Sequence, residues 1–200
     1  MTRRFLALLL PLLLATAACT TDDPQSEPSG PPPFADCAAL TAAPATGVPV
    51  DPTGNPPPGV PATLPDLALP CFTDGAAVAL DGLSGPAVVN LWASWCAPCR
   101  RELPAFQRLA ERSAGTLHVV GVNSRDGREA ARSIGLDFGL TFPTLADPEE
   151  QLSRQLGRNA LPLTLFVDGQ GRLRHLDSSG ALDDATLTGL VRQHLGVVPG

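Results

Sequence analysis

The chain has 200 residues, a formal net charge of −6 at pH 7 and an ordinary apolar content of 44%. This length predicts one domain with additional segments, and the composition is sufficient for a hydrophobic core. The acidic balance and the lack of a basic stripe argue against nucleic acid as a partner.

The first 18 residues have the features of an export signal. Two arginines precede an apolar run over residues 5–14, which is too short to span a bilayer comfortably. Small residues then lead to Cys19, in a pattern that resembles a lipobox, where cleavage precedes a lipid-modified cysteine. We therefore expect a signal peptide over residues 1–18, lipidation of Cys19 and an extracytoplasmic protein anchored to the cell membrane by its acyl chains. Ordinary signal-peptidase cleavage just before Cys19 is the alternative.

Residues 19–64 are expected to form a proline-rich linker. Residues 20–65 hold thirteen of the 22 prolines, with Thr, Ser, Gly and Asp between them. A segment of this composition buries little apolar surface and favours an extended, semi-rigid tether. The folded domain is predicted over residues 65–196.

The predicted elements of that domain alternate between strands and helices. A continuous apolar run over residues 87–92 is typical of a buried central strand. Apolar residues recur at helical spacing directly after it. In chain order, we expect strands at 67–69 and 76–80, the central strand, a helix at 96–114 containing Pro104, a strand at 117–122, helices at 128–136 and 148–156, a hairpin of 163–167 with 173–176, and a closing helix at 183–195. This order predicts an α/β fold with a mixed sheet.

Cys96 and Cys99 occupy the point where the buried strand gives way to a helix. The unpaired amides and partial positive charge of a helix N-terminus favour a thiolate, so the pKa of Cys96 should be lowered. Cys96 would attack a substrate disulfide, and Cys99, one turn deeper, would resolve the mixed disulfide. A zinc site is the alternative for such a pair, but it needs two more ligands with similar local spacing. His118, His175 and His194 stand apart in the sequence, so we expect no metal and no cofactor.

The segment from Val89 to Pro104, with its run Trp-Cys-Ala-Pro-Cys-Arg-Arg-Glu-Leu-Pro, resembles the active-site segment of the TlpA/ResA-like thioredoxin family. The similarity spans about residues 65–195. It implies a thioredoxin-like three-layer sandwich with an N-terminal β-hairpin extension, and the activity of a membrane-anchored thiol–disulfide oxidoreductase.

The same resemblance implies two substrate contacts, and the tryptophan beside Cys96 suggests a third. The segment that begins Leu161-Pro162 matches the family's cis-proline strand, which makes Pro162 the cis-proline facing the disulfide. The backbone of Leu161 would then pair with an extended substrate strand. Trp95 is expected to pack beside the sulfurs and to shape the substrate surface, whereas Trp92 is expected to belong to the core.

One position departs from the thioredoxin pattern. Thioredoxins have a buried aspartate six residues before the first active-site cysteine, and this chain has Asn90, which cannot act as a base. Many relatives carry an acid in the loop after the next strand, where Asp126 lies. Asp126 is therefore a candidate proton acceptor, with a solvated loop acid as the alternative.

Cys37 and Cys71 are left over after these assignments. In an exported protein a remaining pair usually forms a structural disulfide, which here would fasten the proline-rich segment to the domain. A second redox pair that relays electrons to Cys96, or two unpaired thiols, are the alternatives.

Three functions remain open at this stage. The first is a reductase that keeps exported thiols reduced, such as the haem-binding cysteines of apocytochromes c, and it needs a membrane electron-transfer partner. The second is an oxidase that forms disulfides in secreted proteins, and the reduction potential separates the two. The third is an anchored binding module with a vestigial disulfide. A peroxidase is the weakest alternative. A peroxidatic cysteine usually has no second cysteine beside it and has Thr and Pro upstream, and this sequence has no such arrangement.

Overall fold

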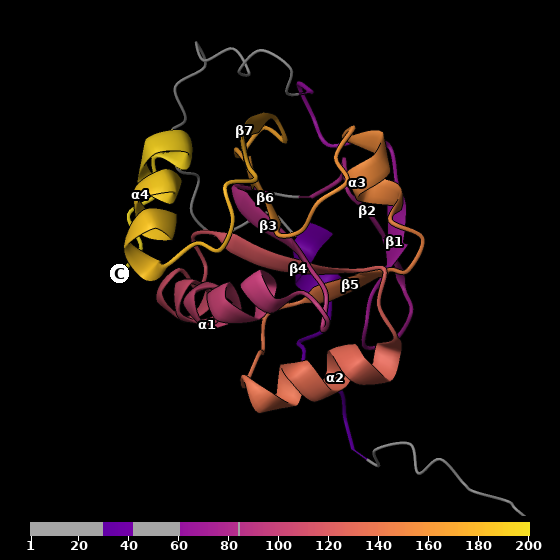
Figure 1. Cartoon of the computed structure of the whole chain (residues 1–200). Coiled ribbons are helices and arrows are strands. Elements are labelled where there is room, and N and C mark those ends of the chain that lie inside the picture. Colours follow the sequence, from indigo (N-terminus) through magenta and orange to yellow (C-terminus); the bar gives the residue numbers. More distant parts are fainter. Residues whose placement is uncertain (1–29, 42–60, 84) are drawn as a thin grey trace, which may run out of the picture.

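A computed structural model describes residues 30–41, 61–83 and 85–200 of the chain (Figure 1). Its centre is a five-stranded mixed sheet with the order β5-β4-β3-β6-β7. Strands β3, β4 and β5 run parallel, whereas β6 is antiparallel to β3 and β7 is antiparallel to β6. The strands are β3 (Ala87–Trp92), β4 (His118–Ser124), β5 (Thr144–Asp147), β6 (Leu163–Val167) and β7 (Leu173–Asp177).

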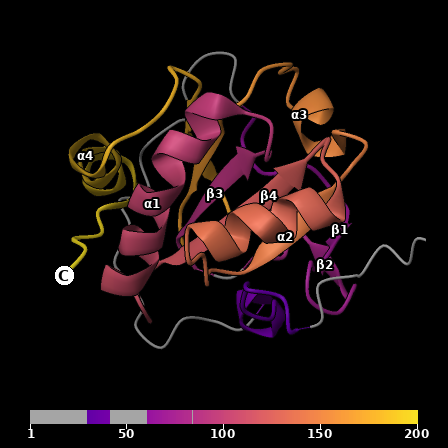
Figure 2. The same ribbon diagram turned by 60° about the horizontal axis from the view of Figure 1, so that its bottom comes forward.

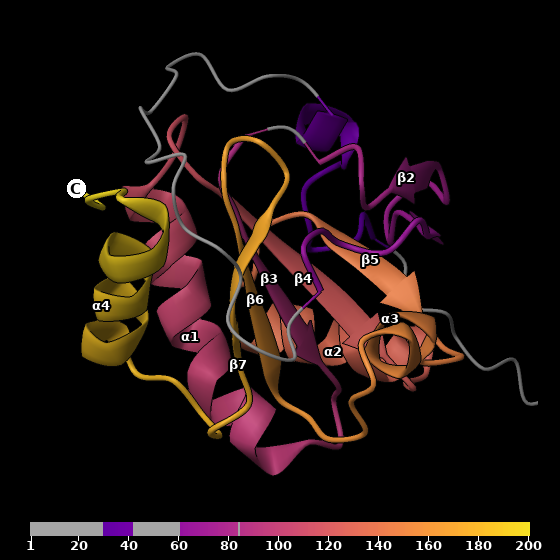
Figure 3. The ribbon, with the colours of Figure 1, turned by 90° about the horizontal axis from the view of Figure 1, so that it is seen from above.

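Helices and a hairpin cover the two faces of this sheet. One face packs against α1 (Ala97–Arg112), α2 (Arg128–Asp137) and α4 (Asp184–Leu195), and Figure 2 shows α1 and α2 in front of the strands. The other face packs against α3 (Gln151–Gln155) and the antiparallel hairpin of β1 (Ala68–Pro70) with β2 (Ala77–Ala79), which Figure 3 shows from above. The predicted three-layer α/β sandwich is therefore confirmed.

The central strand β3 separates two hydrophobic cores because its side chains alternate between the faces. Val88 and Trp92 belong to the core under α1, α2 and α4. Val89 and Leu91 belong to the core under the hairpin and α3. Every residue of β3 is buried, as expected for a strand that is covered on both sides.

Two elements differ from the sequence-based expectation. The edge strand β5 was not predicted, because four residues between Pro143 and Pro148 carry too little pattern. Helix α3 begins at Gln151 instead of residue 148. The carboxylate of Asp147 accepts hydrogen bonds from the backbone N–H groups of Gln151 (2.8 Å) and Leu152 (3.0 Å), and this capping sets the start of the helix.

Part of the expected linker is packed against the domain. Within residues 30–41, Phe34 and Leu40 are buried, and residues 38–41 form a short 3₁₀ helix. The N–H of Ala35 donates to the carbonyl of Thr141 at 3.0 Å. The expected signal peptide over residues 1–18, Cys19 and residues 42–60 lie outside the described residues. Within the described ranges, no helix has the length and apolarity needed to cross a membrane.

Candidate active site

A disulfide between Cys96 and Cys99 lies where β3 is followed by α1. Cys96 is the N-cap of α1, and the backbone N–H of Cys99 points at its Sγ at 3.2 Å. Cys99 is fully buried, and Cys96 is 4% exposed. The N-terminus of the helix thus directs an amide and its partial positive charge at the outer sulfur, which is the arrangement that stabilises a thiolate.

Asp126 holds the turn that leads into the disulfide. Its carboxylate accepts hydrogen bonds from the backbone N–H of Ser94 (2.6 Å) and from the hydroxyl of Ser94 (2.7 Å). The amide of Asn123 (2.9 Å) and the N–H of Gly127 (2.9 Å) complete its contacts. The structure therefore brings Asp126 to the site, with both of its oxygens engaged in fixing the loop.

Trp95 provides an exposed aromatic surface next to Cys96. Its side chain is 57% exposed, and the indole N–H donates to the carbonyl of Arg125 at 2.8 Å. The guanidinium of Arg125 lies 5.7 Å from the ring centroid, within the range of a cation–π contact. Trp92, in contrast, is completely buried in the core, as predicted.

The topology places Leu161 and Pro162 beside the active-site turn. They immediately precede β6, whose first residue Leu163 pairs with Leu91 near the end of β3. The Leu161–Pro162 peptide bond is cis, Pro162 is buried, and Leu161 is partly buried. These two residues and Cys96 therefore lie at the same end of the sheet.

The main residue that the sequence analysis missed is Glu102. It is completely buried in α1, where its Oε1 accepts from the amide of Asn90 at 2.7 Å and its Oε2 accepts from the N–H of Leu182 at 3.0 Å. Burial raises the pKa of Glu102 to about 7, although both hydrogen bonds oppose this shift.

The spacing of Glu102 carried a signal that could have identified it. Residues three apart on a helix lie on the same face, so Glu102 follows Cys99 on the side that also buries Phe106. An acidic residue at a position that the helical spacing assigns to the buried apolar face indicates a carboxyl group that is shielded from water. Asn90 cannot act as a base, but its side-chain amide is the group that donates a hydrogen bond to this carboxyl group.

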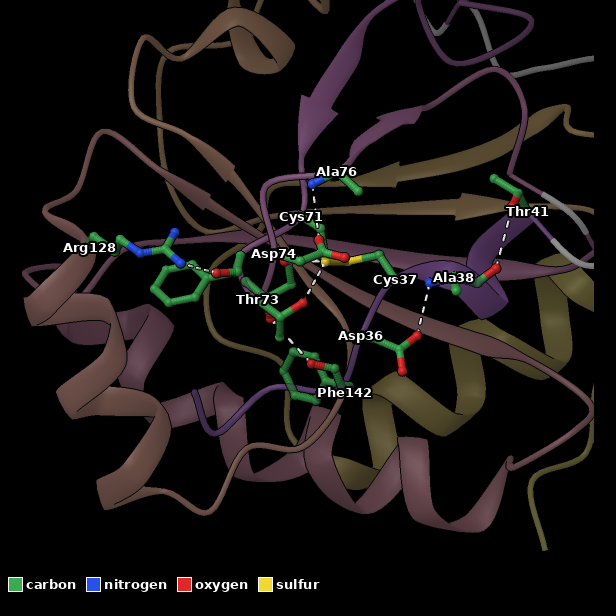
Figure 4. The surroundings of a disulfide bond; sticks show 12 residues. Asp36, Cys37, Ala38, Thr41, Cys71, Thr73, Asp74, Ala76, Arg128 and Phe142 are labelled. Carbon is green, nitrogen blue, oxygen red and sulfur yellow. Dashed lines mark hydrogen bonds between the residues drawn. A yellow bond between two sulfur atoms is a disulfide. The ribbon is translucent and has the colours of Figure 1, made fainter. Parts of the chain in front are cut away.

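A second disulfide joins Cys37 to Cys71 at the edge of the sheet (Figure 4). Both residues are buried, the Thr73 hydroxyl lies 3.1 Å from the Sγ of Cys71, and the Cys37 Sγ lies 3.8 Å from the carbonyl oxygen of Thr144. These cysteines belong to the core under the hairpin, whereas Cys96 and Cys99 belong to the core on the opposite face. The sheet therefore lies between the two disulfides.

The three histidines that were considered as possible zinc ligands, His118, His175 and His194, lie on β4, β7 and α4, away from the segments that carry the disulfides. His175 and His194 stack on each other with ring centroids 4.1 Å apart, next to Phe166. Among the residues that the structure describes, no group of three or more His, Cys, Asp or Glu side chains is arranged to hold a metal ion.

Comparisons with known proteins agree with this geometry. A model of the AhpC/TSA family matches residues 60–176. The thiol:disulfide interchange protein DsbE of Allochromatium vinosum is 33% identical over 140 residues, which cover 68% of this chain and 76% of that protein. ResA of Geobacillus thermodenitrificans, a thiol–disulfide oxidoreductase, is 30% identical over 117 residues, covering 57% and 66% of the two chains.

Other matches are shorter or structural. A DsbE homologue of Paracoccus denitrificans is 40% identical over 92 residues, 46% of this chain, and the match spans about half (49%) of that relative's length. The crystal structure of a DsbF homologue from Corynebacterium diphtheriae superposes with a TM-score of 0.58 at 26% identity, covering 74% of this chain and 99% of that one. The expected resemblance is confirmed: the chain belongs to the AhpC/TSA family and, within it, to the thiol–disulfide oxidoreductases of the DsbE and ResA type.

Proposed function

We propose that this protein reduces disulfides of exported proteins, such as apocytochromes c, through Cys96 and Cys99. The observation that carries the proposal is the position of this pair, with the outer sulfur at the N-terminus of α1 and the inner one buried a turn before a carboxyl group. A binding module would need neither the helix terminus nor the buried carboxyl group at this point.

The first step is attack by Cys96. In the reduced protein the Cys96 thiolate displaces one sulfur of the substrate disulfide, so that a mixed disulfide forms and the released substrate thiolate takes up a proton. The N–H of Cys99 and the N-terminus of α1 stabilise the thiolate before attack. We therefore predict that the pKa of Cys96 in the reduced protein is below the ordinary value for a thiol.

The second step is resolution by Cys99. Its Sγ attacks the Sγ of Cys96, the Cys96–Cys99 disulfide forms again, and the second substrate thiolate leaves with a proton from solvent. Two electrons have then passed from the protein to the substrate, and a dithiol partner protein must return them. Because Cys99 is buried, its own proton needs an internal acceptor.

We assign that acceptor role to Glu102. It lies one helical turn beyond Cys99, and a carboxyl group with a pKa of about 7 exchanges protons readily at neutral pH. Asp126 stays a second candidate from the sequence. Its two oxygens already accept four hydrogen bonds, which suits the role of holding Ser94 and the turn before Cys96.

Substrate would bind on the surface formed by Trp95, Leu161 and Pro162. The exposed indole offers apolar area next to Cys96. The backbone of Leu161 is the proposed partner for an extended substrate segment, in the manner of a strand added to a sheet. The roles of Leu161 and Pro162 follow the resemblance given above, and the role of Trp95 follows its exposed position next to Cys96.

We further propose that the protein is exported and anchored to the membrane through lipidated Cys19, over a linker that ends at the domain. The Cys37–Cys71 disulfide supports export, because buried structural disulfides persist mainly in oxidising compartments. The returning electrons would come from a membrane-bound thiol–disulfide partner.

Trapping with Cys99→Ser tests this function. The variant keeps the attacking sulfur and lacks the resolving one, so it should accumulate a mixed disulfide through Cys96 with an oxidised peptide that carries the Cys-Xaa-Xaa-Cys-His haem-binding motif. Cys96→Ser is the matched control and should accumulate none. Equal adduct formation by both variants would refute the assignment of Cys96 as the attacking residue.

The reduction potential of the Cys96–Cys99 pair then gives the direction of electron flow. A reductase requires a potential well below those of oxidising periplasmic proteins, which lie near −120 mV. A measured value in that oxidising range would instead support a disulfide-forming oxidase.

A further inference from the structure

A shallow groove runs along α1 from Ala97, the residue that follows Cys96. It is lined by Ala97, Arg100, Arg101 and Pro104 of α1, together with Phe138 at the end of α2. Its lining thus combines three apolar side chains with two guanidinium groups.

The groove approaches the disulfide at the start of α1. Positions 97, 100, 101 and 104 share one face of the helix, on the side opposite to the face that buries Cys99 and Glu102. The first lining residue, Ala97, stands between the two cysteines. A substrate attached to Cys96 would therefore have this groove within reach.

Arg100 and Arg101 lack the partners that other arginines of the protein have. Both are exposed, and in the described part of the chain neither guanidinium takes part in a hydrogen bond or an ion pair. On the same helix, Arg108 and Arg112 lie 2.5 Å and 3.7 Å from Asp184.

The position of these two cations is unfavourable for the helix itself. The N-terminal end of a helix carries a partial positive charge, which favours acidic side chains, and the first turn of α1 contains none. The positive charges of Arg100 and Arg101 at this end of α1 are therefore uncompensated within the described residues, in a chain with a net charge of −6.

We propose that this groove binds an acidic peptide segment next to the cysteine of a partner disulfide. The proposal rests on the function proposed above and names the substrate class of the same site. The stretch from Ala97 to Pro104 is about 10 Å long, the reach of about three extended residues. We therefore assign to the partner two carboxylates within about three residues of the reacting cysteine, which guanidinium groups bind well.

Three peptides of equal length test the proposal. Each contains one Cys-Xaa-Xaa-Cys disulfide, and they differ only in flanking Glu, Gln or Lys residues. Reduced full-length protein should reduce the acidic peptide about five- to tenfold faster than the neutral one, and the basic peptide more slowly still. The preference should shrink in 0.5 M NaCl, because exposed charges are screened over about 4–5 Å at that concentration.

The variant Arg100→Gln/Arg101→Gln should abolish the difference between the acidic and the neutral peptide. Rates are divided by the rate with hydroxyethyl disulfide, an uncharged small substrate, because loss of these cations also affects the ionisation of Cys96. Arg192→Gln, at another exposed arginine late in α4, is the matched control and should keep the full preference.

Several outcomes would overturn the proposal. The three peptides could react at equal rates, or the acid preference could survive in the double variant. A third such outcome is binding of anionic lipid vesicles through these arginines without any peptide preference, which would assign the surface to the membrane. If wild-type protein failed to reduce even hydroxyethyl disulfide, the proposed function itself would be wrong.

Discussion

The two disulfides of this protein are equally shielded from solvent and differ in what surrounds them. Cys96 and Cys37, the more exposed member of each pair, are both 4% exposed. The Cys96 sulfur meets an amide N–H and a helix N-terminus, whereas the Cys37 sulfur faces the carbonyl oxygen of Thr144. An amide and a helix N-terminus stabilise a thiolate and a carbonyl oxygen does not, so Cys96 and Cys37 differ in their local electrostatics and not in their exposure.

The two disulfides also differ in the number of residues between their cysteines. Cys96 and Cys99 are three residues apart within one rigid helical start, so breaking their bond frees little of the chain. Cys37 and Cys71 are 34 residues apart and join a segment before the domain to the edge of the sheet. Under the proposed function, the first pair opens during turnover and the second stays closed.

The largest expected effect is on the rate of disulfide reduction, which should depend on one cysteine pair and not on the other. Cys96→Ser should lower disulfide reduction by at least about a thousandfold, because it removes the attacking thiolate. Cys37→Ser/Cys71→Ser should retain the rate within a few-fold, measured with the same peptide disulfide at a temperature where the variant is folded. A comparable loss of activity in Cys37→Ser/Cys71→Ser would instead support a relay of electrons from this pair to Cys96, and the two pairs would no longer differ in function.

The second effect is on stability. Opening the 34-residue loop with Cys37→Ala/Cys71→Ala should lower the free energy of unfolding by about 3–4 kcal/mol in the chain-entropy model. Urea unfolding of the oxidised proteins measures this loss, and Cys96→Ala/Cys99→Ala is the matched comparison, with a smaller loss expected from its short loop. The account of the two pairs fails here if both variants lose the same free energy.

The third effect belongs to Glu102. Its pKa is about 7 in the folded protein and near the ordinary value of 4.5 when unfolded, so the folded state binds the extra proton between these values. Its contribution to stability is therefore present below about pH 4.5 and lost as pH rises through about 7, on the order of 3 kcal/mol.

Glu102→Gln removes this titration and keeps the shape of the side chain. The difference in unfolding free energy between wild type and variant should change by that amount between pH 4.5 and pH 8. The lowered pKa values of His118 and His194 act in the opposite direction, but they are the same in both proteins and cancel. A constant difference across this range would mean that folding does not raise the pKa of Glu102.

The smallest effect concerns the surface around the reactive pair. Trp95→Ala should lower kcat/KM for peptide disulfides by about three- to tenfold, because an exposed aromatic contact next to Cys96 is lost. Leu136→Ala, which truncates another side chain that is more than half exposed, is the control and should leave the value unchanged. If kcat/KM were equal for wild type and both variants, Trp95 would not contribute to substrate binding.

Much of the fold and the reactive pair could be predicted from the sequence because their signals are local. The apolar run of β3 and the cysteine pair after it are contiguous, and the Cys37–Cys71 pairing followed from the two cysteines left over in a chain that was expected to be exported. The helical spacing of Glu102 could have indicated a buried carboxyl group, but its pairing with Asn90 could not be predicted, because that pairing is a hydrogen bond between two different elements. The packing of Phe34 was missed because its partners, Phe72 and Trp92, are distant in sequence.

The most direct test of the central claim is the pH dependence of alkylation in the fully reduced protein, with each modified cysteine identified by mass spectrometry. The account predicts that Cys96 reacts first, with an apparent pKa below the ordinary value of about 8.5, and that Cys37 and Cys71 react slowly at neutral pH. If Cys96 titrated at or above 8.5, or reacted no faster than Cys37, the electrostatic distinction between the two pairs would be wrong.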